Sequence, residues 1–131
     1  MTVFSKVEIA VTLLLRAKEL FNLGEYVPST VLAGAGQQLL RDLCKARGVD
    51  STIQTISEVS GHSEKKIHQL VVDTYNKMKH ADVDPDDSVV ISEQEPRVLM
   101  TLAAVDLMRL KEIKSQEISD FLEFIQKIKS T

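Results

Sequence analysis

The organisation of this chain depends on residues 75–87, which read YNKMKHADVDPDD. The stretch holds His80 at a predicted helix end, four aspartates in the next seven positions, and Pro85. No helical pattern returns before Ser92, and a proline among closely spaced aspartates favours a turn over a helix interior. The stretch therefore predicts one acidic loop between the fourth and fifth helices of an all-helical fold.

Four helical patterns precede this loop, each with apolar residues every three to four positions, the spacing of one helix face. Gly24 and Gly48 are predicted to end the first and second helices. Asp50 and Ser63 are predicted N-caps of the third and fourth helices. The inward-facing stripes predicted for the four helices are Val3, Val7, Ala10, Leu14, Ala17 and Phe21; Val31, Leu32, Ala35, Leu39, Leu43 and Ala46; Ile53, Ile56 and Val59; and Ile67, Leu70, Val71, Thr74 and Met78.

The second helix contains two interior glycines, Gly34 and Gly36, in the run Ala33–Gly36. Each costs on the order of 1 kcal/mol of helix stability relative to alanine. Two such residues indicate that another chain segment approaches closely. We expect tight packing against the first helix, with a subunit interface or a pocket wall as the alternative.

Two further helical patterns follow the loop. Ser92 and Glu95 fit a capping box, with Pro96 tolerated in the first turn. The fifth helix is apolar enough to be central, and the sixth has the most regular stripe. Their predicted stripes are Val98, Leu99, Leu102 and Val105, and Ile118, Phe121, Leu122, Ile125 and Ile128. The sequence predicts a single domain over residues 1–131, an all-α bundle of five or six helices.

The composition narrows the class of protein. A net charge of −3 argues against broad, non-specific binding to a phosphate backbone, which needs a basic surface. Cys44 is the single cysteine, so no intrachain disulfide is expected, which is typical of a cytoplasmic protein. The most apolar run, Ile9–Leu15, is too short to span a membrane. No nucleotide-loop, zinc or flavin motif occurs, so no cofactor is predicted.

The end of the fourth helix is the predicted site. Asn76 and His80 are four residues apart and share a helix face. A histidine can act as a general base near neutral pH, and a neighbouring amide can orient the base or a phosphate. Lys77 and Lys79 could attract an anionic ligand. The alternative is that His80 only caps the helix and interacts favourably with its dipole.

The loop itself allows a second hypothesis. With Asp82 as position 1, Asp84 falls at position 3, Asp86 at position 5 and Glu93 at position 12, which is the ligand spacing of a calcium-binding helix–loop–helix. Position 6 is Asp87 instead of glycine, and Pro85 restricts the backbone at position 4. A solvated acidic turn is the competing interpretation.

Residues 32–40 (LAGAGQQLL) and 75–82 (YNKMKHAD), followed by Asp84-Pro85-Asp86, resemble small bacterial proteins of the HEPN type. In helix order the resemblance covers about residues 5–112. It implies a helical bundle that forms a homodimer through the motif-bearing helices. In active members an arginine, a following polar residue and a nearby histidine cleave RNA without a metal.

Carried over to this chain, Asn76 matches the polar residue of the motif and His80 the histidine. Tyr75, or Thr74 under a longer spacing, stands where the arginine is expected. Gln37 and Gln38 stand where acidic residues are common. Neither Tyr75 nor Thr74 can stabilise an anionic transition state as a guanidinium does.

The sequence thus predicts a cytoplasmic, dimeric, HEPN-like binding or accessory module with weak or lost nuclease chemistry. Its ligand, an RNA or a nucleotide, would lie near Asn76, Lys77, Lys79, His80 and Asp84, and a partner protein is a further expectation. One alternative is a metal-independent ribonuclease of toxin type that uses His80. The other is a cation-binding domain that uses Asp82, Asp84, Asp86 and Glu93.

Overall fold

The computed structural model describes residues 2–80, 85–86, 88–112 and 115–129. The regular structure in these ranges is entirely helical: α1 (Lys6–Asn22), α2 (Tyr26–Ala46), α3 (Thr52–Ser60), α4 (Glu64–Lys79), α5 (Gln94–Arg109) and α6 (Gln116–Lys129). The predicted all-α bundle is confirmed, with six helices in the described ranges. None of these helices has an apolar stretch long enough to cross a lipid bilayer.

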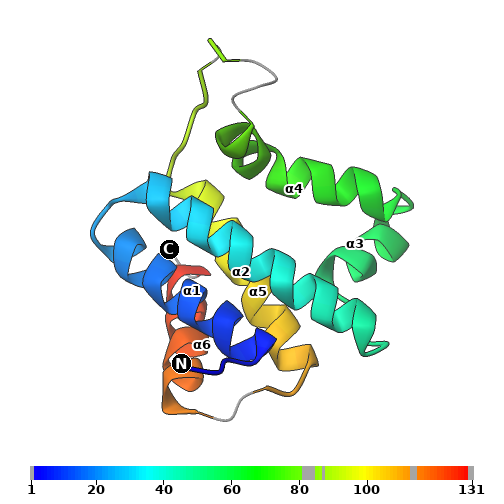
Figure 1. Cartoon of the computed structure of the whole chain (residues 1–131). Coiled ribbons are helices and arrows are strands. Elements are labelled where there is room, and N and C mark those ends of the chain that lie inside the picture. The colour runs from blue at the N-terminus through cyan, green and yellow to red at the C-terminus, as the bar shows by residue number, and fades with distance from the viewer. Residues whose placement is uncertain (1, 81–84, 87, 113–114, 130–131) are drawn as a thin grey trace.

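Helices α1 and α2 form a hairpin (Figure 1). Ser5 begins α1 with a capping box, in which its hydroxyl accepts the N–H of Glu8 and the Glu8 carboxylate accepts the N–H of Ser5. Gly24 follows α1 at φ 76°, a conformation that suits glycine and turns the chain into α2 as predicted. Val3 precedes the helix and is 85% exposed, so its predicted place in the core stripe is wrong.

Gly36 lies where α2 touches α1 most closely. A methyl group at this position would come within 2.9 Å of Leu14 Cγ and 3.3 Å of the Ala10 carbonyl oxygen. In the same contact the Ser29 hydroxyl donates to a carbonyl of α1 at 2.8 Å. The predicted tight packing against the first helix is therefore confirmed for Gly36. Gly34 faces a different helix.

The buried face of α2 differs from the predicted one. Val31 is 38% exposed, and the predicted leucines lie only partly buried at the edge of the core. The enclosed face consists mostly of small or polar residues: Ser29, Thr30, Ala33, Gly34, Gly36, Gln37, Leu40 and Cys44. Helix α2 packs against both α1 and α5, and the distance between packed helices depends on the side chains at the contact. Small and polar side chains therefore occupy most of the centre beside Leu40, and the predicted leucines lie on the flanks.

Helix α5 is central, as predicted, and contacts each of the other described helices. In Figure 1, α2 and α5 pass through the middle of the molecule, with α1 and α6 on one side and α3 and α4 on the other. Both the N–H and the hydroxyl of Ser92 donate to the Glu95 carboxylate, at 2.7 and 2.8 Å. The helix nevertheless starts at Gln94, one residue later than a Ser92 N-cap implies.

Helices α3 and α4 form an arm beside α2 (the α3–α4 arm, residues 52–79). Ser63 caps α4 as predicted, whereas Ser51, and not Asp50, caps α3. Each cap hydroxyl accepts a backbone N–H of the first helical turn, at 3.1 Å for Ser51 and 3.2 Å for Ser63. The first turns of the two helices are thereby fixed.

Only part of the predicted apolar stripe on this arm is buried. Ile53 and Ile67 are enclosed, but Ile56 is 37%, Val59 85% and Leu70 68% exposed. The arm packs on the bundle from one side only, so the far side of each helix has no neighbour among the described residues. The prediction that Ile56, Val59 and Leu70 face inward is wrong.

Candidate functional site

The predicted site residues lie at the end of α4, where they remain accessible. His80 is the C-cap of the helix, at φ −117°, and its side chain is exposed. Asn76, one turn earlier, is half-buried. Lys77 forms an exposed ion pair with Asp73 at 3.1 Å. Asp84, the remaining predicted ligand-binding residue, lies outside the described residues.

Tyr75 lies between Gly34 and Lys79. A methyl group at position 34 would come within 2.5 Å of Cδ2 of the Tyr75 ring. The Lys79 ammonium lies 4.4 Å from the centre of the same ring, a cation–π geometry. Tyr75 therefore packs α4 against α2. Gly34 accommodates this ring, whereas Gly36 accommodates the close approach of α1.

The predicted cation loop is described only at its edges. Asp82 and Asp84 lie outside the described residues, while Asp86 and Glu93 are exposed. Glu93 pairs with Arg97 at 3.5 Å. Within the described ranges, no group of three or more histidine, cysteine, aspartate or glutamate side chains is placed to hold a metal ion. The calcium hypothesis stays a prediction.

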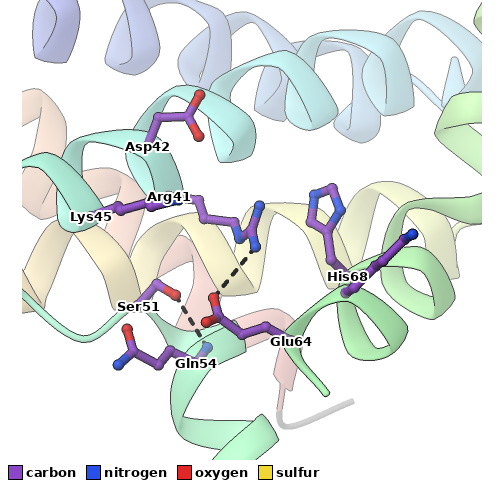
Figure 2. A pocket seen from close by; sticks show the side chains of 8 residues that line it. Arg41, Asp42, Lys45, Ser51, Gln54, Glu64 and His68 are labelled. Atoms are coloured by element: carbon purple, nitrogen blue, oxygen red, sulfur yellow. Dashed lines mark hydrogen bonds and ion pairs between the residues drawn. The ribbon is translucent and has the colours of Figure 1, made fainter. Parts of the chain in front are cut away.

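A pocket of about 400 Å³ lies between α2, α3 and α4, and we call it the polar pocket (Figure 2). Six of the residues that line it are Arg41, Lys45, Ser51, Glu64, Lys65 and His68. They come from the second half of α2, the start of α3 and the first turns of α4. Sequence reasoning identified none of them as a site residue.

Arg41 reaches across the pocket from α2 toward α4 (Figure 2). Its side chain is only 23% exposed, and its Nη2 lies 3.4 Å from Glu64 Oε1. That distance is long for a charge-assisted hydrogen bond, which is usually 2.7–2.9 Å. The Arg41 Nε–H is buried without an acceptor among the described residues. The guanidinium, with five N–H donors, is therefore poorly paired for a largely buried cation.

His68 forms the next part of the wall and is linked to α2 through Gln38. Gln38 donates its amide N–H to Asp42 at 3.0 Å, so its amide oxygen faces His68 Nε2 at 3.2 Å. Because that oxygen can only accept, the neutral imidazole carries its proton on Nε2. Burial, and then the positive charge of Arg41, lower the pKa of His68.

His68 is half-buried and belongs to the lining of the pocket. The neighbouring Gln37 is fully buried, and neither polar atom of its amide has a partner in the described structure. Gln37 and Gln38 thus have different roles: one is enclosed in the bundle, and the other joins α2 to α4.

Helix α5 holds the α3 wall of the pocket in place. Asp106 is 1% exposed, and its Oδ1 accepts the backbone N–H and the hydroxyl of Thr52 at 2.8 and 2.7 Å. Arg109 donates to the Asp50 carbonyl at 3.1 Å and to the Thr55 hydroxyl at 2.6 Å. Burial raises the pKa of the Asp106 carboxyl more than the Thr52 hydrogen bonds lower it.

The chain matches no family model, no curated protein and no solved structure. The candidate sites lie at the two ends of α4. His80 lies at its C-terminal end and the polar pocket at its N-terminal end. His68 and His80 are 12 residues apart, or about 18 Å along a helix.

Proposed function

We propose that this protein is a HEPN-like, dimeric binding or accessory module whose nuclease chemistry is lost or weak. The observation that carries the proposal is the role of Tyr75. The position where the resemblance expects an arginine holds a side chain that fills the space above Gly34. An arginine guanidinium at this position would stabilise an anionic transition state, whereas Tyr75 joins α4 to α2.

The neighbouring groups favour binding over cleavage. His80 is exposed at the helix end and can act as a base or as a hydrogen-bond partner. The two lysines that could replace the arginine already have partners, Asp73 for Lys77 and the Tyr75 ring for Lys79. Both interactions are with exposed lysines and are weak. A ligand phosphate can therefore recruit these ammonium groups, but they are not preorganised for transition-state stabilisation.

The proposal includes a homodimer formed through the motif-bearing helices. In support, three large apolar side chains of the α3–α4 arm are accessible: Ile56, Val59 and Leu70. Leu70 belongs to the motif helix itself and is 68% exposed. Burial of such side chains between two copies would stabilise the pair by the hydrophobic effect.

The function is tested with a fluorescent single-stranded RNA in EDTA. We expect saturable binding without cleavage, weakened in His80→Ala and in Lys77→Gln but not in the control His62→Ala, which removes an exposed histidine near the start of α4. Cleavage that disappears in His80→Ala would instead establish the metal-free ribonuclease. No RNA binding together with no cleavage would leave only the accessory role.

The dimer is tested by light scattering, with an expected mass twice the 14.6 kDa of the chain. Leu70→Lys should lower that mass. Val3→Lys, which changes an 85% exposed apolar side chain before α1, should not. A wild-type protein that stays monomeric at micromolar concentration would contradict the dimer.

A further inference from the structure

We propose that the polar pocket binds a small phosphorylated ligand, with its phosphate held by Arg41, Lys45 and Lys65. This site is separate from the His80 end of α4 and does not depend on the function proposed above. The evidence is the charge around the pocket, the poor pairing of Arg41, and the volume of the space.

The pocket is locally positive in an acidic protein. Three cations, Arg41, Lys45 and Lys65, and two anions, Asp42 and Glu64, line it. Their sum is +1 with His68 neutral, whereas the whole chain carries −3. Asp42 already accepts a hydrogen bond from Gln38. Within the described residues, neither Lys45 nor Lys65 forms an ion pair.

Arg41 provides the second, independent observation. A largely buried guanidinium normally satisfies most of its donors. Here one N–H faces Glu64 at 3.4 Å, and the buried Nε–H has no acceptor in the part of the chain that the structure describes. A phosphate matches the planar, bidentate geometry of guanidinium better than a single carboxylate oxygen at this distance. The Nη end of the side chain, which Glu64 approaches only to 3.4 Å, therefore has capacity for an anion from solution.

The helices that frame the pocket add to the same preference. Ser51 and Gln54 lie at the start of α3, and Glu64 and Lys65 at the start of α4. The N-terminal ends of both helices thus border the space, and the positive ends of their dipoles favour an anion. This contribution supplements the side-chain charges.

The size of the pocket limits the ligand. A volume of about 400 Å³ is within the range of small-molecule sites. It leaves room for an organic group beside the phosphate. A polynucleotide is disfavoured at this site because a space of about 400 Å³ holds one small group and not a length of strand. The ligand class is therefore a phosphate monoester of a small molecule.

The test uses calorimetry and NMR titration of the full chain with inorganic phosphate, AMP and a single-stranded RNA. The pocket variant is the double substitution Lys45→Gln with Lys65→Gln, because both lysines are exposed and their loss should not unfold the protein. The control is Lys18→Gln with Lys127→Gln, which removes the same charge from another surface hollow, beside Phe124. Arg41→Gln is the third variant.

We expect wild type and control to bind phosphate and AMP saturably, with the largest NMR shifts at Ser51, Gln54 and Lys65. The pocket variant and Arg41→Gln should each weaken binding by about tenfold, as expected for loss of a charge-assisted contact. The proposal would be overturned if neither phosphate nor AMP bound saturably. Equal weakening in pocket and control variants, or RNA binding alone that depends on Lys45 and Lys65, would also overturn it.

Discussion

Tyr75 and Gly34 occupy complementary space on facing helices. A methyl group at position 34 would lie 2.5 Å from Cδ2 and 2.6 Å from Cγ of the Tyr75 ring. The contact sets how closely α4 approaches α2. It lies between the two ends of α4, so it positions both the His80 end and the polar-pocket end of this helix relative to α2.

The first prediction concerns this contact. Gly34→Ala should destabilise the fold by up to about 2 kcal/mol, because overpacking costs about 1–3 kcal/mol and the gain in helix propensity offsets only about 1 kcal/mol of that cost. Urea denaturation measures the change. In a Tyr75→Ala background the ring is absent, so the same substitution should become stabilising. An alanine that stabilises the protein in both backgrounds would show that the contact is not tight.

The second prediction concerns Asp106, whose pKa is raised by burial. A carboxyl with a raised folded pKa binds its proton more tightly in the native state, so its contribution to stability falls as pH rises from its unfolded to its folded pKa. The stability of wild type relative to Asp106→Asn should therefore be greater near pH 4.5 than at pH 7. Urea unfolding of both proteins at the two pH values measures this difference, and the reverse trend would contradict it.

The third prediction concerns Cys44, which is fully buried and whose pKa is raised to about 11, mainly by burial. Because the thiolate is the reactive species, native protein should react very slowly with Ellman's reagent at pH 8. In urea, one thiol per chain should react at once, since Cys44 is the single cysteine. Fast labelling of the native protein would mean that α2 opens readily.

The elements that the sequence predicted well are those with a local physical cause. Gly24 ends α1 because its positive φ suits glycine, Ser63 caps α4 through its own hydroxyl, and α6 follows its apolar spacing. The buried face of α2 was mispredicted because hydrophobicity favours leucines, whereas two close neighbours favour small side chains there. Which residues of α2 are buried depends on how closely α1 and α5 approach it.

The polar pocket could not be predicted from the sequence for a similar reason. Gln38, Arg41 and Lys45 follow each other at three- and four-residue steps on α2, and Glu64 and His68 do so on α4, which indicates two polar helix faces. Nothing in either pattern says that the two faces meet. The placement of α4 beside α2, fixed by Tyr75 at Gly34, brings them together.

The last prediction concerns His68 and reports on Arg41 directly. Groups that influence its charge are Arg41 and Asp42 on α2, and Glu64 and Lys79 on α4. Burial is the largest cause of the lowered pKa and Arg41 the next, so an NMR titration should place the midpoint below the ordinary value of 6.5. Arg41→Gln should raise the midpoint only in part, because the ring stays half-buried.

The lowered pKa of His68 also determines how the stability of the protein changes with pH. A histidine with a lowered folded pKa opposes its own protonation, so wild type should lose stability as pH falls through 6.5. His68→Gln removes the titrating group, and its stability should depend less on pH between about 5 and 7. A His68 midpoint at or above 6.5, or one that Arg41→Gln leaves unmoved, would mean that the guanidinium does not face the imidazole in solution. Arg41 would then not be held at the centre of the polar pocket.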